Sequence, residues 1–165
     1  MNILRSLWRD TEGAALVEGA ILLPFLFVLM LGIFEFSWFI YQQHMVSAGL
    51  RDAARYLTRA ATPCEPSSEA WNTAQNNAKN LATTGYTNGS KSRISGWRAG
   101  MISVYCTAVD NPIIDGLRNY RGEDVIYTVT VSTRFNEPSL GFFRLLGFGN
   151  PVISLSYSQR VIGPG

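Results

Sequence analysis

The sequence predicts an α+β protein in which a long N-terminal helix crosses a membrane and continues as a stem into a small domain. An apolar segment over residues 14–41 predicts the transmembrane helix, and good helix formers extend it over residues 42–62. Residues 63–165 contain one more helical segment and several strand-like segments, which predict a second helix and a small antiparallel sheet. We expect a lollipop shape, with the domain at the end of the long helix.

The apolar segment is long enough to span a bilayer. Residues 20–40 would rise about 31 Å as a helix at ~1.5 Å per residue, close to the ~30 Å of a hydrocarbon core. Trp38 and Tyr41 lie at its far end, where aromatic rings favour the headgroup level. A buried core helix is usually shorter, and a secretory signal peptide would have a shorter apolar run before an A-x-A cleavage site. We therefore expect a retained single-pass anchor.

Composition limits the chemistry that the chain can support. The net charge of +2 is too small to indicate nucleic-acid binding, and one His with two Cys leaves little material for a metal site. No hydrolase, metalloprotease or P-loop motif is present. Acidic residues around one loop form either a solvated surface or a cation site without EF-hand spacing: Asp110, Asp115, Glu123 and Asp124. We expect no catalytic residue, no metal and no cofactor.

The cysteines favour one orientation where the basic residues do not. Arg5 and Arg9 precede the anchor, but a basic stripe follows it: Arg51, Arg55 and Arg59. The stripe is either a solvated helix face or a contact with lipid headgroups or a partner's acidic groups. Cys64 and Cys106 both follow the anchor, which predicts a disulfide between them in an oxidising periplasm. The alternative is a pair of buried thiols in a cytoplasmic domain.

A glycine and a glutamate mark the entrance to the apolar segment. Gly13 precedes it, and Glu18 lies five residues later, inside it. A carboxylate at the bilayer centre costs ~2.5–3.5 kcal/mol, so a purely structural anchor would avoid it. Gly-x-x-x-x-Glu at the head of an apolar helix resembles the processing site of type IV prepilins. The resemblance implies that a prepilin peptidase cuts after Gly13, which would make residues 1–13 a leader and Ala14 the new N-terminus.

The longer N-terminal sequence resembles the TadE-like family of tight-adherence (Tad) pilus biogenesis. The matching positions are Gly13, Ala14, Glu18, Ala20, Pro24, Gly32, Glu35, Ala53, Ala54 and Arg55. They cover roughly the first third of the chain, and Gly19 departs from the pattern because related pilins often carry an aromatic residue there. The resemblance implies a pilin-like fold, and pairing of the Ala14 amine with Glu18 of a neighbouring subunit.

Four residues of the long helix are expected to serve helix packing or assembly together with Glu18: Pro24, Gly32, Glu35 and Arg55. Pro24 removes a backbone hydrogen bond and should kink the helix. Gly32 would allow another helix to approach closely. Ordinary membrane-helix usage explains Pro24 and Gly32 equally well, and Glu35 is alternatively an interfacial carboxylate near the outer surface.

The domain begins at Pro63, which ends the stem. Ser67 or Ser68 is expected to cap a second helix, EAWNTAQNNAKNLA, and Gly85 to end it. Alternating and β-branched segments predict strands over residues 101–109, 124–135 and 151–161. Residues 140–149, LGFFRLLGFG, either pack on the sheet or touch the membrane as a short amphipathic helix or loop.

Two functions follow from the resemblance and the anchor. The first is a minor pseudopilin-like structural component in assembly of a Tad or type IV-like pilus, with pilins or pseudopilins, the prepilin peptidase, the inner-membrane assembly platform and the lipid bilayer as partners. The alternative is a membrane-anchored periplasmic binding or scaffold module of an envelope secretion complex. A membrane-tethered enzyme is a third possibility. The expected location is the inner membrane, with the N-terminus cytoplasmic, the domain periplasmic, and incorporation into an extracellular pilus as an option.

Overall fold

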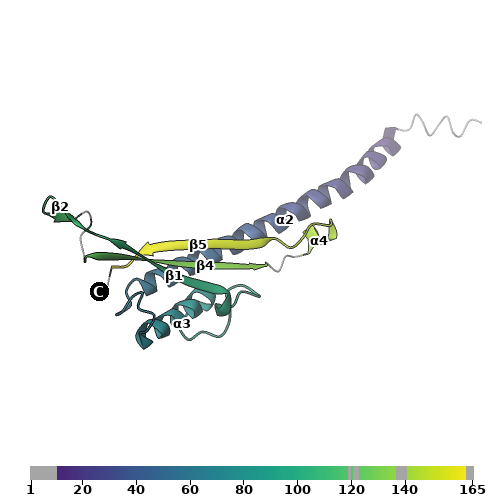
Figure 1. The fold of residues 1–165 in the computed structure, drawn as a ribbon. Coiled ribbons are helices and arrows are strands. Elements are labelled where there is room, and N and C mark those ends of the chain that lie inside the picture. Colours follow the sequence, from purple (N-terminus) through teal and green to yellow (C-terminus); the bar gives the residue numbers. More distant parts are fainter. Residues whose placement is uncertain (1–10, 119, 121–122, 137–140, 163–165) are drawn as a thin grey trace, which may run out of the picture.

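The computed structural model confirms the α+β class and describes residues 11–118, 120, 123–136 and 141–162. Its elements are α2 (Thr11–Leu57), α3 (Glu69–Thr84), a 3-10 turn η1 (Ala99–Met101), β1 (Ile102–Asp110), β2 (Ile113–Ile114), β3 (Leu117–Arg118), β4 (Val125–Asn136), α4 (Phe142–Leu145) and β5 (Val152–Arg160). Residues 1–10 of the predicted leader lie outside the described part of the chain. One half of α2 extends away from the domain, and its other half lies against the sheet and α3 (Figure 1).

Helix α2 is continuous over 47 residues and contains Pro24. It is the one helix in the described part of the chain that is long and apolar enough to cross a membrane. The helix ends at Leu57, so residues 58–62 of the predicted helical stem are instead a turn and loop. Thr58 holds this end, because its hydroxyl donates to the Arg55 carbonyl (3.0 Å) and its own carbonyl accepts from the Ile162 amide (3.2 Å).

The main sheet has the order β1-β4-β5 and is antiparallel throughout. All three strands lie within one or two residues of the predicted ranges. The central strand β4 buries Val129 and Val131 completely, as the predicted alternation requires. The hairpin formed by β2 and β3 was not predicted from the sequence. Asp115 and Gly116 both adopt positive φ in its two-residue turn, which is the backbone that such hairpins need.

The second half of α2 forms one wall of the hydrophobic core. Helix α3 packs on it, with Ser68 as its N-cap and Gly85 as its left-handed C-cap, as predicted. The core collects fully or largely buried side chains from every layer: Val46, Leu50, Ala53, Ala54, Leu57, Trp71, Ala74, Ala78, Ala82, Ile94, Trp97, Ile102, Val129, Val131, Phe135 and Ile153. Trp97 lies in residues 85–100, whose content of Gly, Ser, Thr and Asn predicts a loop or hairpin. Its ring nitrogen donates to the Thr133 hydroxyl (3.0 Å).

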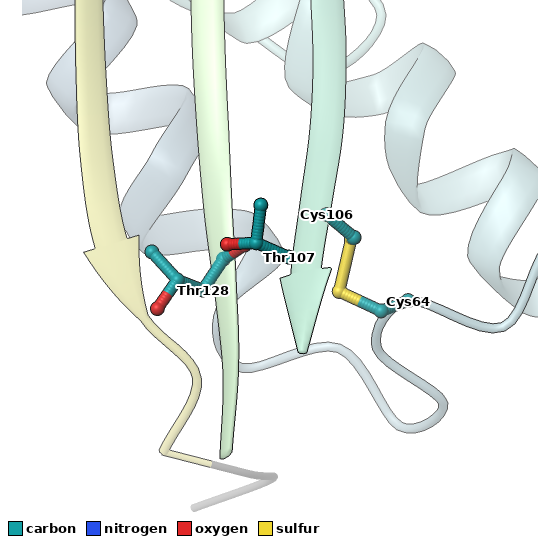
Figure 2. The surroundings of a disulfide bond; sticks show 4 residues. All are labelled: Cys64, Cys106, Thr107 and Thr128. Carbon is teal, nitrogen blue, oxygen red and sulfur yellow. A yellow bond between two sulfur atoms is a disulfide. The ribbon is translucent and has the colours of Figure 1, made fainter. Parts of the chain in front are cut away.

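The predicted disulfide joins Cys64 to Cys106, with the two Cα atoms 5.7 Å apart (Figure 2). Cys64 lies in the loop after α2 and Cys106 on β1, so the bond ties the end of the long helix to an edge strand. It closes a loop with a sequence separation of 42 residues. In the chain-entropy model such a loop stabilises the fold by ~4 kcal/mol.

Gly49 is required by the close approach of α2 to α3. A Cβ added there would lie 2.5 Å from the Ala82 carbonyl oxygen and 2.8 Å from a ring carbon of Trp97. Both neighbours are fixed, one as backbone and the other as a fully buried ring. The packing of the two helices therefore depends on the missing side chain, although glycine is a poor helix former.

We predict that Gly49→Ala lowers the free energy of unfolding of the domain by about 1–3 kcal/mol, the usual cost of overpacking a core. Thermal unfolding of the purified full chain in detergent measures the change. Gly19→Ala is the matched control, because a Cβ at Gly19 meets nothing within 4 Å. A domain melting temperature that Gly49→Ala leaves unchanged would contradict the packing constraint.

Candidate assembly and packing site on the long helix

The residues expected to serve assembly occupy three separate levels of α2. Gly13, Glu18 and Pro24 lie in its exposed first half, whereas Arg55 lies near its end. Glu35 lies between them. Glu18 and Glu35 are 17 residues apart, which is about 26 Å along a helix at ~1.5 Å per residue. These residues therefore form no single site within one copy of the chain.

The first level is bare helix surface. The described part of the chain offers no partner to Glu18, whose side chain is exposed. A Cβ added at Gly13 would likewise meet nothing within 4 Å. Large apolar side chains around these residues are also exposed, among them Leu16, Val17, Ile21 and Phe25. This surface is available to lipid or to another protein.

The second level is an internal contact, centred on Glu35. Its side chain is only 2% exposed, and its two carboxylate oxygens accept hydrogen bonds from the backbone N–H groups of Gly141 and Phe142, each at 3.2 Å. These N–H groups belong to the first turn of α4, where a helix has no backbone acceptors of its own. A carboxylate from α2 therefore caps a helix that lies more than a hundred residues later in the chain.

Gly32 belongs to the same contact. A Cβ at Gly32 would be 3.8 Å from a ring carbon of Phe142, which is ordinary van der Waals distance. The neighbour that packs over Gly32 is thus a side chain of α4. The contact also explains the position of residues 141–148, which lie beside α2 (Figure 1).

The third level is the Ala53-Ala54-Arg55 segment, which lies where α2 packs on α3. Ala53 and Ala54 are fully buried in the core, so their small size serves helix packing. Arg55 is exposed and lines a groove with Tyr56, Arg59, Glu69 and Asn77. Arg51, from the same basic stripe, lies over the ring of Tyr157, 5.8 Å from its centre. The groove is a basic surface, and its lining residues do not indicate a particular ligand.

Hydrogen bonds from Asn111 hold together the loop that carries the acidic residues Asp110, Asp115, Glu123 and Asp124. Asn111 is buried, and its side-chain amide donates to the carbonyls of Tyr120 and Glu123, both at 2.9 Å. Asp124 forms an ion pair with Arg118. Within the described residues, no group of three or more His, Cys, Asp or Glu side chains is placed to hold a metal ion.

We predict that Glu35→Ala speeds hydrogen exchange at the amides of Gly141 and Phe142. Leaving a buried donor unsatisfied costs about 1–3 kcal/mol, which is roughly 5- to 150-fold in the exchange rate. Mass-spectrometric exchange on the full chain in nanodiscs measures it. Glu35→Gln keeps one side-chain acceptor and should show a smaller change, and Glu18→Gln should show none at these amides. Unchanged exchange in Glu35→Ala would mean that the cap does not hold α4.

Comparison with known proteins agrees with the N-terminal sequence pattern. No curated protein and no solved structure matches the chain significantly. The family model described as TadE-like protein matches residues 13–55. This range begins at the glycine of the predicted cleavage site and ends at Arg55, beyond the anchor. The match confirms the resemblance that the sequence indicates, and over these residues the chain is similar to the TadE-like family.

Proposed function

We propose that the protein is a minor pseudopilin-like structural component in the assembly of a Tad or type IV-like pilus. One observation carries the proposal. Glu18 is a carboxylate in the exposed apolar half of α2, it lies five residues after Gly13, and no described residue of its own chain pairs with it. A lone carboxylate in an apolar helix destabilises a simple anchor. Pairing with a group of another protein would offset that cost and explain why Glu18 is present.

In the proposed mechanism a prepilin peptidase cleaves between Gly13 and Ala14 and removes the leader, residues 1–13. The new amine of Ala14 then pairs with Glu18 of a neighbouring pilin or pseudopilin. An ion pair in a low dielectric is strong when its geometry is good, and it sets the axial register of two helices. Pro24 is also exposed and lies in the same half of α2, where neighbouring helices would pack. The inner-membrane assembly platform would act on this helix surface.

The proposed location is the inner membrane, with the N-terminus cytoplasmic and the domain periplasmic. The Cys64–Cys106 disulfide supports this orientation, because such bonds persist in oxidising compartments. The apolar first half of α2 fits a single-pass anchor. The subunit could then leave the membrane with a growing pilus or stay at its base.

A second candidate function is a scaffold module that holds another envelope protein and never enters a filament. Exposed apolar side chains on the β2–β3 hairpin favour it: Ile113, Ile114 and Leu117. The hairpin lies at the end of the domain farthest from the exposed half of α2 (Figure 1). Exposed apolar groups gathered at one place are typical of contacts with another protein. A scaffold of this kind would not need Glu18.

We predict that Glu18→Ala leaves the protein inserted in the membrane but abolishes or strongly reduces assembly. Removing a charge that costs up to ~2.5–3.5 kcal/mol in the bilayer should favour insertion. Losing the partner of the Ala14 amine should nevertheless weaken the contact between subunits. The measurement is pilus formation and co-purification of pilins from cells that carry the variant.

Glu65→Ala is the matched control, because Glu65 is an exposed carboxylate in the domain and outside the anchor. Protein abundance and N-terminal processing are measured in the same cells, so a defect in assembly is separated from a loss of protein or of cleavage. Normal pili and normal recovery of partners from Glu18→Ala cells would refute the pilus role and leave the scaffold function.

A further inference from the structure

Helix α4 and the turn after it carry apolar side chains that the domain does not cover. Leu145 is 81% exposed, Leu146 48% and Phe148 63%. These three residues are the α4 patch. Helix α4 lies between β4 and β5 in the chain, beside α2 and on the side of the domain from which the exposed half of α2 emerges (Figure 1). A cluster of this kind at one place indicates a binding surface.

The level of the α4 patch along α2 indicates what covers it. Helix α4 contacts α2 at Gly32 and Glu35, which lie eight and five residues before Ile40. These separations are about 12 and 7.5 Å along a helix at ~1.5 Å per residue. With residues 20–40 across the bilayer, α4 lies just inside its boundary. Amphipathic segments at membrane surfaces bury their apolar face to a similar depth, about 5–10 Å.

Six of the eight backbone N–H groups of residues 141–148 donate to acceptors within the protein. Lipid tails offer no hydrogen bonds, so backbone polar groups must find partners within the protein. Glu35 accepts from the first two N–H groups, those of Gly141 and Phe142. The N–H groups of residues 145–148 donate to carbonyl oxygens of residues 141–144. The buried carboxylate of Glu35 therefore lets the start of α4 leave water.

We infer that the α4 patch inserts into the bilayer leaflet on the domain side, as a second membrane attachment beside the anchor. Exposed apolar side chains of α2 at the same level continue the lipid-facing surface: Ile33, Phe34 and Phe36. Arg144 is exposed in the last turn of α4 and can extend its guanidinium to the headgroup phosphates. The inference rests on the membrane anchor of the proposed function and is independent of the pilus role.

Three exposed leucines allow a comparative test: Leu145 in the α4 patch, Leu117 on β3 and Leu26 in the anchor. Each is replaced singly by a nitroxide-bearing non-canonical amino acid, which leaves the disulfide intact. The full chain is reconstituted in phosphatidylcholine vesicles with a minor fraction of phosphatidylglycerol. Power saturation then measures the collision of each nitroxide with oxygen, which concentrates in lipid, and with a water-soluble nickel chelate.

The nitroxide at position 145 should behave like that at position 26, with frequent oxygen collisions and several-fold fewer chelate collisions than at position 117. A label at 145 that meets the chelate as often as at 117, while 26 stays in lipid, overturns the inference and leaves the anchor intact. Chelate access at 26 refutes the anchor itself and the inference with it. Spin–spin broadening at 145 that disappears on dilution with unlabelled protein overturns the inference in favour of a second copy.

Discussion

A single unbroken helix belongs to two environments, and this constraint fixes the arrangement of the other elements. The first half of α2 presents large apolar side chains outward, whereas its second half fills the core of the domain from Val46 to Leu57. The change in environment occurs without a glycine or proline between Phe39 and Ala48. Because the helix is continuous there, the domain has a fixed height and rotation relative to the anchor. Contacts between α4 and α2 follow from that fixed geometry.

The domain relies on α2 for its stability as well as its position. A three-stranded sheet needs cover on its apolar face, and α2 supplies contacts to both β4 and β5. A domain of about 100 residues buries a smaller share of its surface than a larger domain does, so each covering element matters. The Cys64–Cys106 bond adds a covalent tie between the end of this helix and β1. Separating the domain from the second half of α2 would expose much of the core.

The sequence predicts the elements well where one local signal dominates. The apolar run identifies α2. Ser68 and Gly85 mark the two ends of α3, and the alternation of side chains identifies the strands and the buried face of β4. The Asp115-Gly116 pair was a signal for the missed hairpin, hidden by its position in a polar, acidic loop.

Trp97 could not be placed in the core, because its segment is rich in residues typical of loops. The partner of Glu35 lies more than a hundred residues away, and no local pattern connects the two. Gly49 is a poor helix former within α2, and its presence is explained only by the close packing of Ala82 and Trp97.

The two glutamates of the anchor differ in a way that sequence alone does not reveal. Glu35 accepts two hydrogen bonds within its own chain, whereas Glu18 has no partner among the described residues. In the proposed function its partner is the Ala14 amine of a neighbouring processed subunit. The most direct test is the N-terminal residue of the protein isolated from membranes of cells with an active prepilin peptidase, read by intact mass and terminal peptide mapping. Cleavage between Gly13 and Ala14 predicts Ala14 as the first residue. A terminal peptide that retains Gly13 and the residues before it would contradict the pilin-type assignment.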